Sequence, residues 1–328
     1  MSNLTYNLSC KQELKFRPDG SFKILMMSDI QETLEYDPRT LEGMHRLVEK
    51  VAPDLVFLGG DNCNGLVLRT KEELVEYLKI FSAPMERRKI PWAHVYGNHD
   101  HDILMDDVEK TKLYEEFPYC VSKHTENIPG TTNFVLPIKS SDGKGIAFTV
   151  WGLDTNNEYH QTGLPGSELI DHQWEMKVPV NASLWDIVHF EQLMWYWNSS
   201  KELETYCGAT VPGILFQHIA PWEFQIVVDN MEATGGEGST VERMGLGAFN
   251  SGLFATILQR GDIQCIACGH SHMDDFSGKF CGVTLCLDGS AGYSPYGIDE
   301  LRGGRVFEIR ESDPGDIVTY MVRYDSLN

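Results

Sequence analysis

The chain of 328 residues is predicted to fold as an α/β protein. In its first hundred residues, short apolar segments alternate with segments that have the apolar spacing of a helix. This order is typical of a parallel sheet with right-handed crossovers. Polar residues that can bind ligands follow several of the apolar segments directly. No internal repeat or low-complexity linker interrupts the sequence, which predicts a single domain over residues 1–328.

Three short apolar segments predict buried strands at 22–28, 54–60 and 92–96. A helix is predicted between the first two strands, over 38–51, because this segment begins with a proline, which suits a first helical turn, and continues with apolar residues at helical spacing. A second helix is predicted between the second and third strands, over 71–82.

The middle of the chain, about 104–210, is less regular and is interpreted as an elaboration of the same domain. It holds a predicted helix after Met105, strands near 133–138 and 145–153, and a helix over 187–204. Beyond it, strands are predicted at 211–217 and 263–268, and a helix near 249–260. The Gly-rich loop over 235–247 is either a mobile lid or a surface loop. Three further strands, around 282–287, 304–310 and 317–324, have antiparallel character.

The composition is that of an ordinary soluble globular protein, with 42% hydrophobic and 23% charged residues. No apolar run approaches the ~18 residues of a membrane span, and the first twenty residues lack the basic start and apolar core of a signal peptide. Both observations predict a cytoplasmic location. The net charge of −21 opposes binding to nucleic acids or anionic membranes. A phosphate-binding site on such a chain needs local positive charge, which bound metal cations would supply.

The eight cysteines belong to a chain that is long enough to need no disulfide scaffold. Cys265 and Cys268 have the spacing of a zinc-binding pair, but they lie in the predicted strand 263–268. Residues three apart on a strand point to opposite faces, which is a poor geometry for binding one ion. Both are therefore predicted to be buried thiols.

Five of the predicted strands end in polar residues. Each such residue alone has an ordinary explanation, since a strand-end Asp often forms a turn and a single His is usually structural. Together they place oxygen and imidazole donors at the carboxyl edge of a sheet, where ligands bind in open α/β folds. Donors of this kind suit Mn, Fe or Zn. The strand ends are Ser28-Asp29-Ile30-Gln31, Gly59-Gly60-Asp61-Asn62, Gly97-Asn98-His99-Asp100, His218 and Gly269-His270-Ser271-His272.

In chain order, these motifs resemble the calcineurin-like metallophosphoesterase family, whose pattern is D-x-H, GD, GNH[DE], H and GHxH. The resemblance covers about 22–310. Further segments resemble the purple-acid-phosphatase-like subgroup of fungi, plants and some bacteria; they are FKILMMSDI, GGDN, GLDTNN, the Gln192–Trp195 segment, SGLF, GHSHMDDF and RGGRVFEI.

The resemblance implies a four-layer α/β/β/α sandwich of mixed sheets, with two divalent metal ions at the carboxyl ends of the strands. It also implies which residues bind them. Asp29 and His272 would hold the first metal ion, with Gln31 beside it as a candidate ligand. Asn98, His218 and His270 would hold the second, and Asp61 would bridge both.

The implied reaction is the hydrolysis of a phosphate monoester or a small phosphodiester. Water on two cations is acidified enough to supply hydroxide, and the cations can clamp phosphoryl oxygens. His99 would face the substrate, where an imidazole can protonate the leaving alkoxide or stabilise the transition state. Asn98 is a neutral ligand beside an anionic substrate, and Asp100 is expected to be a hydrogen-bond partner behind the site or a loop cap. His101 and Asp102 lie past the motif and are not assigned a role.

The sequence departs from the family pattern at two positions. Gln31 replaces the usual His of D-x-H, and an amide oxygen is a weaker donor to Zn or Fe than imidazole. The first metal site is therefore expected to be weaker or tuned to another metal. Asn64 stands where true purple acid phosphatases place a Tyr ligand, which predicts a protein without purple colour. The hypothesis for Asn64 is a hydrogen bond to His99.

Few residues can be assigned to substrate binding. Trp222, Tyr293 and Tyr296 either line the entrance or pack in the core, and Arg243 and Arg302 are cationic candidates for phosphate. The expected partner is a small phosphate ester, with no nucleic acid and no membrane. The main alternative to an enzyme is a catalytically impaired scaffold for protein binding. Two others are a nuclease, which the charge opposes, and a structural-metal protein, which would not need the motif histidine.

Overall fold

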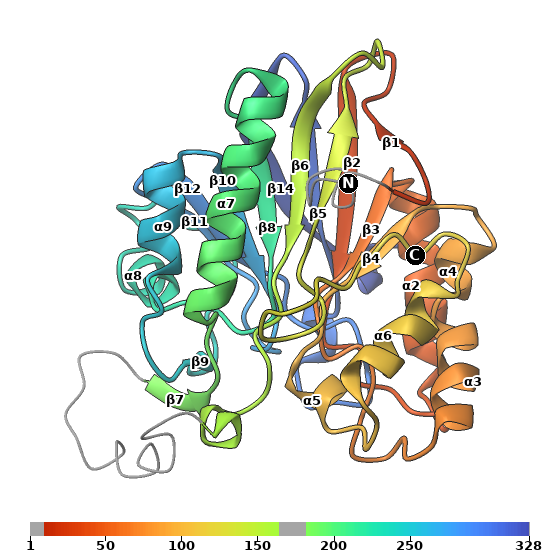
Figure 1. Ribbon diagram of the computed structural model, residues 1–328. Coiled ribbons are helices and arrows are strands. Elements are labelled where there is room, and N and C mark those ends of the chain that lie inside the picture. Colours follow the sequence, from red (N-terminus) through yellow and green to blue (C-terminus); the bar gives the residue numbers. More distant parts are fainter. Residues whose placement is uncertain (1–9, 164–181, 328) are drawn as a thin grey trace.

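The computed structural model describes residues 10–163 and 182–327, so that part of the predicted elaboration lies outside the described residues. Two sheets face each other, and helices cover the outer face of each (Figure 1). This arrangement confirms the predicted four-layer α/β/β/α sandwich with mixed sheets. The single domain over residues 1–328 stays a prediction.

The strands form three sheets. The seven-stranded sheet contains, in spatial order, β1 (Leu14–Lys15), β5 (Phe134–Lys139), β6 (Ile146–Gly152), β8 (Gly213–Phe216), β10 (Ile263–Cys268), β12 (Val283–Leu287) and β11 (Ser277–Phe280). The five-stranded sheet contains β14 (Asp313–Arg323), β13 (Gly303–Arg310), β2 (Ser21–Met27), β3 (Leu55–Leu58) and β4 (Trp92–His94). The two-stranded sheet contains β7 (Ala182–Trp185) and β9 (Leu246–Gly247).

Helices cover both outer faces of the sandwich (Figure 1). The five-stranded sheet is covered by α2 (Pro38–Val51), α3 (Lys71–Phe81), α4 (Ala83–Glu86) and α6 (Asp107–Glu115), and the seven-stranded sheet by α7 (Phe190–Cys207), α8 (Glu223–Asp229) and α9 (Leu253–Arg260). The shorter helical elements are α5 (Asn98–His101), η1 (Tyr159–Thr162), η3 (Asp299–Leu301) and η4 (Tyr324–Leu327). Within the described part of the chain, none of the helices combines the length and the apolar composition that crossing a membrane requires.

Three layers of buried apolar side chains hold the structural layers together. In β2, Leu25 and Met27 pack toward the helices of the five-stranded sheet, whereas Ile24 and Met26 pack between the two sheets. A third cluster lies between the seven-stranded sheet and its helices. Because successive strand residues point to opposite faces, a strand that is covered on both sides needs an unbroken apolar run, which is what the sequence shows here.

The two cysteines with zinc-site spacing lie on opposite faces of β10. Cys265 is buried between the sheets, and Cys268 is buried against the outer helices. All eight cysteines are free. The interpretation of this pair as buried thiols is confirmed.

Strand directions agree with the predictions at all but one place. β2, β3 and β4 pair in parallel, and β13 pairs antiparallel with both β2 and β14. The antiparallel character predicted around 282–287 is wrong on one side, because β12 runs parallel to β10 and antiparallel to β11. Most residues of β12 are buried, so apolar–polar alternation is a weak guide to its direction.

Several of the observed elements, among them α5, β7, α8 and β11, were not predicted. The most consequential is α5, a single turn made of Asn, His and Asp directly after β4. It forms because the Asp100 carboxylate accepts the backbone N–H of Gly97 at 2.9 Å and so caps the turn. An element this short has no apolar period, and its existence depends on that side chain.

Candidate metal centre

Polar side chains from both sheets meet at one edge of the sandwich, beyond the carboxyl ends of β2, β3, β4, β8 and β10. Two groups of three side chains have ligand atoms within 4.8 Å of one another. One group is Asp29, Asp61 and His272, and the other is Asp61, His218 and His270. Asp61 belongs to both groups. The geometry is consistent with a binuclear metal site in which one carboxylate is shared.

Several ligand atoms at this edge are buried without a hydrogen-bond partner: Oδ1 of Asp29, Oδ1 of Asn98 and Nε2 of His218. Nε2 of His218 lies 3.3 Å from Oδ2 of Asp61 and 3.9 Å from Oδ1 of Asp29, but it makes no hydrogen bond with either. Nearly all buried polar groups in proteins are paired, because leaving them unpaired costs free energy. Unpaired electron-pair donors gathered in one place are satisfied by cations, so the residues present fit bound metal ions.

Backbone carbonyls orient two of the imidazoles toward the centre. Nδ1 of His218 donates to the carbonyl of Gly59 at 2.9 Å, and Nδ1 of His272 donates to the carbonyl of Tyr296 at 2.9 Å. In both rings this leaves Nε2 as the nitrogen that faces the ligand groups. Gly60 makes room for the first ring, since a Cβ there would lie 2.5 Å from Nδ1 of His218.

The backbone is strained at several candidate ligands. Such strain costs free energy and is typical of functional sites, where the surrounding structure imposes it. Positive φ angles occur at Asp29 (53°), Gln31 (40°), Asp61 (49°) and His270 (74°).

Mutual charges shift the pKa values of the ligands in both directions. Burial alone disfavours ionisation of Asp61, but His218 and further imidazoles outweigh burial and hold the pKa of Asp61 well below its usual range. Burial likewise disfavours protonation of His218, yet Asp61 and Asp29 raise the pKa of His218 to about 9. Burial, aided by the charge of His218, lowers the pKa of His270 to about 3. A metal ion bound by His218 would therefore compete with a proton for this ring.

Gln31 lies beside the first ligand group, but with its amide nitrogen toward the other ligands. Nε2 of Gln31 donates to Oδ2 of Asp61 at 2.6 Å and lies 3.3 Å from Nε2 of His272. The amide oxygen is the atom that could bind a metal ion, and turning it inward would break the hydrogen bond to Asp61. The amide is therefore a poor ligand here for a reason of geometry as well as of donor strength.

Gln31→His is expected to tighten metal binding at the first site about tenfold, or ~1.4 kcal/mol, because an imidazole nitrogen would replace an NH₂ group that cannot bind metal. Titration calorimetry of Mn²⁺ or Zn²⁺ into metal-free protein measures the change. Gln259→His, on the exposed side of α9, is the matched control and should leave the affinity unchanged. Equal affinities in the Gln31→His variant and the unmodified protein would contradict this account of the first site.

His99 lies beside the ligand groups rather than within them. Its backbone N–H donates to Oδ1 of Asp61 at 2.8 Å, and Nδ1 of its ring lies 2.8 Å from Oδ2 of Asp102. The side chain is 33% exposed and lines the cavity over the centre, so a substrate can reach it. The hydrogen bond to Asp102 raises the pKa of His99 against the opposing effect of burial.

The hypothesis that Asn64 hydrogen-bonds His99 is wrong. Oδ1 of Asn64 is buried without a partner, and the ring of His99 is held by Asp102 instead. The spacing of His99 and Asp102 in the sequence could have indicated their contact, since residues three apart on a helical turn are neighbours. It could be interpreted only once α5 was known to exist.

Asp100 lies behind the site and does not line the cavity over the centre. Its buried carboxylate accepts the backbone N–H groups of Gly97 at 2.9 Å and Asn62 at 3.1 Å. Burial, with a contribution from Asp61, raises the pKa of Asp100 to about 6. The residue thus ties the loop after β4 to the loop after β3, and its geometry is that of a loop cap.

A cavity of about 230 Å³ lies over the centre, and the Gly-rich loop forms part of its wall. Glu242, Arg243 and Gly245 of this loop line the cavity. Gly245 packs directly on a candidate ligand, because a Cβ at this position would lie 2.4 Å from Nε2 of His270. In the structure the loop is therefore a wall of the site and not a distant surface loop.

Two of the three aromatic candidates for the entrance do not line this cavity. Trp222 donates from Nε1 to the carbonyl of Gly247 at 2.7 Å and packs against the core beneath α8. Tyr293 packs against the core under α2, with the Arg39 guanidinium 4.1 Å from its ring centre. Proximity to a motif in sequence is a weak guide to where a side chain points.

Two aromatic residues belong to the cavity wall. Tyr296 stacks on His272 with ring centres 4.1 Å apart, and Trp185 meets His270 edge-on at 4.7 Å. Tyr296 was a weak candidate from sequence. Trp185 was missed, because it follows no motif and belongs to the unpredicted β7.

Comparisons with known proteins agree with the geometry. The sequence profile described as calcineurin-like phosphoesterase matches residues 22–274. Probable inactive purple acid phosphatase 14 of Arabidopsis thaliana is 28% identical over 317 residues, which cover 88% of this chain and 74% of that protein. Phosphatase DCR2 of Saccharomyces cerevisiae is 24% identical over 294 residues, covering 81% of this chain and 46% of that protein.

Similarity to solved structures supports the fold. A dimetal phosphatase from Danio rerio superposes with a TM-score of 0.59 at 11% sequence identity, covering 92% of this chain and 96% of that one. At this identity the similarity shows a common architecture only, so the chemistry has to be inferred from the residues of this chain.

Proposed function

The chain belongs to the calcineurin-like phosphoesterase family, and we propose that it is a metal-dependent hydrolase of phosphate monoesters or small phosphodiesters. The observation that carries the proposal is the conjunction of two ligand groups that share Asp61 with an accessible His99 beside them. A purely structural metal site would need the ligands but no histidine in the cavity.

The metal ions would be held by side chains from both sheets. When bound, such ions supply an acidified water and electrostatic contacts to phosphoryl oxygens, and their mixed oxygen and nitrogen ligands suit Mn, Fe or Zn. Asp29 and His272 are the proposed ligands of one ion, with Gln31 beside it. Asn98, His218 and His270 are the proposed ligands of the other ion, and Asp61 is the proposed ligand of both.

His99 is the proposed acid for the leaving alkoxide. Because Asp102 holds Nδ1, the other ring nitrogen is the one available to a substrate in the cavity. Asp102 also favours the protonated ring, which is the form that a general acid needs. Asp100 acts indirectly, because it fixes the turn that carries Asn98 and His99.

A second candidate function is a scaffold that keeps the fold without hydrolysis. It is favoured by the replacement of the family His by Gln31 and by relatives named as probable inactive enzymes. Against it, the chain keeps the shared Asp61 and an accessible His99 with its own carboxylate partner. A scaffold would have no use for that pairing, so hydrolysis is the better-supported function.

Metal-reconstituted protein tests the proposal directly. Metal-free protein loaded with Mn²⁺, Fe²⁺ or Zn²⁺ in turn is expected to hydrolyse p-nitrophenyl phosphate, bis-p-nitrophenyl phosphate or both, and to lose this activity on chelation. The preferred ester distinguishes a monoesterase from a diesterase. Metal-loaded protein that is inactive on a broad panel of esters would instead favour the scaffold.

The remaining predictions concern partners and location. A phosphate ester is the substrate class that the family implies. The absence of nucleic-acid and membrane partners and the cytoplasmic location stay predictions from charge and composition.

A further inference from the structure

Two arginines are candidates for binding phosphate, Arg243 and Arg302, and they lie in different environments. Arg302 is buried, and its guanidinium donates to the hydroxyl of Ser290 and, at 2.8 Å, to the carbonyl of Pro295. Arg243 is exposed and lines the cavity over the metal centre, as His99 does. Of the two arginines, Arg243 is therefore the one placed to contact a phosphoryl group at the centre.

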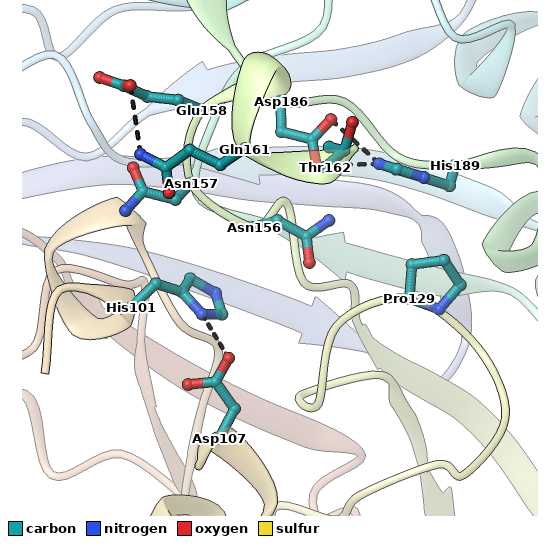
Figure 2. A pocket seen from close by; sticks show the side chains of 10 residues that line it. All are labelled: His101, Asp107, Pro129, Asn156, Asn157, Glu158, Gln161, Thr162, Asp186 and His189. Atoms are coloured by element: carbon teal, nitrogen blue, oxygen red, sulfur yellow. Dashed lines mark hydrogen bonds and ion pairs between the residues drawn. The ribbon is translucent and has the colours of Figure 1, made fainter. Parts of the chain in front are cut away.

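A larger cavity, of about 410 Å³, is shown in Figure 2. His101 of α5 contributes to its lining, whereas His99 of the same turn lines the cavity over the metal centre. Asp61, which both ligand groups share, also lines the cavity over the centre. A phosphoryl group that contacts the metal ions and His99 therefore belongs in the smaller cavity, which Arg243 lines.

The chain immediately before Arg243 is anchored beside the first ligand group. The Glu242 carboxylate accepts the backbone N–H of Met273 at 2.7 Å through one oxygen and the hydroxyl of Tyr296 at 3.0 Å through the other. Met273 directly follows His272, a member of the first ligand group. Because both oxygens of Glu242 are used in these contacts, the position of the chain at residue 242 is fixed.

The chain immediately after Arg243 is anchored on the other ligand group. Gly245 lies against the ring of His270, where a Cβ would be 2.4 Å from Nε2. Arg243 therefore begins between the two candidate metal sites, and its side chain lines the cavity over both of them. A guanidinium keeps its positive charge in proteins, so this wall of the cavity carries a permanent cation.

The phosphoryl group of a monoester offers one oxygen more than two metal ions need. It has three non-bridging oxygens, over which the negative charge is spread in the transition state. Two cations can hold two of these oxygens, and the third is left for a donor from the protein. A diester has no third non-bridging oxygen, because a second organic group is bonded there. The planar fork of N–H groups on a guanidinium suits a phosphoryl oxygen.

We propose that Arg243 binds the third non-bridging oxygen and thereby makes the protein a phosphomonoesterase that hydrolyses diesters less efficiently. The inference rests on the proposed function and names its substrate class. At about pH 8 a phosphate monoester carries close to two negative charges, because its second pKa is about 6, whereas a diester carries one. The guanidinium therefore favours the monoester by charge as well as by hydrogen bonding.

Arg243→Gln and Arg243→Lys test this role in the metal-loaded protein. The measured quantities are kcat/KM for p-nitrophenyl phosphate and for bis-p-nitrophenyl phosphate, which release the same alcohol, in samples of equal metal content. The unmodified protein should prefer the monoester. Arg243→Gln should lower kcat/KM about tenfold to hundredfold for the monoester, the effect of lost charge-assisted hydrogen bonds, and less than about threefold for the diester. Arg243→Lys keeps the charge without the fork, so its monoester value should lie in between.

Arg310→Gln is the matched control. Arg310 is also exposed, but it pairs with Ser21 at the opposite end of β2 from Asp29. Both of its kinetic values should equal those of the unmodified protein. An equal loss on both esters in Arg243→Gln would indicate a structural effect and overturn the proposal. An unchanged monoester value in that variant, or a preference of the unmodified protein for the diester, would also overturn it and leave the proposed function standing.

Hydrolysis of neither ester with any metal would instead count against the proposed function. Titration calorimetry of inorganic phosphate into the metal-loaded protein then decides the role of Arg243. The Kd for phosphate is expected to rise about tenfold or more in Arg243→Gln and to stay unchanged in Arg310→Gln. Equal Kd values for Arg243→Gln and the unmodified protein, or no binding by either, would overturn the inference.

Discussion

His99→Ala is expected to lower kcat for phosphate ester hydrolysis by roughly 10²- to 10⁴-fold, the usual contribution of a positioned general acid. The ring lies outside both ligand groups, so the amount of bound metal should not change. Steady-state kinetics at saturating ester, together with elemental analysis of the same protein sample, measures both quantities. Loss of rate with metal retained would assign the ring to the reaction itself.

His124→Ala is the matched control for this variant. Nδ1 of His124 is hydrogen-bonded to the carbonyl of Thr131, and the residue lies outside both the ligand groups and the cavity over them. Its kcat is expected to stay within about twofold of the unmodified value, as for a substitution away from the site. If His99→Ala kept full activity, the acid would have to be another group. If it lost metal, the ring would have to be counted among the ligands.

Two elements with a uniform pattern could be predicted from the sequence almost to the residue. The predicted and observed bounds agree for α2 (Pro38–Val51) and for β10 (Ile263–Cys268). In α2, the Asp37 side chain accepts the backbone N–H of Arg39, so the start of the helix is determined locally. The two-residue β9 is held by pairing with the distant β7, and the single-turn α5 is held by its Asp100 cap, so no apolar period reveals either element.

The candidate site likewise has one part that could be predicted from the sequence and one part that could not. The ligand groups were predictable because each ligand follows a strand directly, and the sheet itself then brings the strand ends together. The cavity wall was not, because Trp185 and Glu242 come from segments whose course depends on packing. For the same reason, the sequence left Trp222 and Tyr293 between the entrance and the core, and the structure packs both against the core.

Asp61→Asn is expected to have the larger effect of the two substitutions argued here, with loss of both metal ions and a fall in activity of roughly 10³-fold or more. The side chain belongs to both ligand groups, and its Oδ1 also accepts the backbone N–H of His99. An amide cannot supply the negative charge that two cations share. Elemental analysis after dialysis against trace metal, and kinetics on the same sample, give the two readouts.

Asp262→Asn separates the ligand role of Asp61 from the cost of removing a buried charge. Asp262 is also buried, at the opposite end of β10 from the metal centre, where the hydroxyls of Tyr196 and Ser200 donate to it. Both variants should lower the free energy of unfolding in urea, but only Asp61→Asn should lose metal. Retention of two ions and full activity in Asp61→Asn would contradict the shared site. Retention of one ion would assign Asp61 to a single site. The ion retained should then be the one held by His218 and His270, because Gln31 leaves the first group short of a strong ligand.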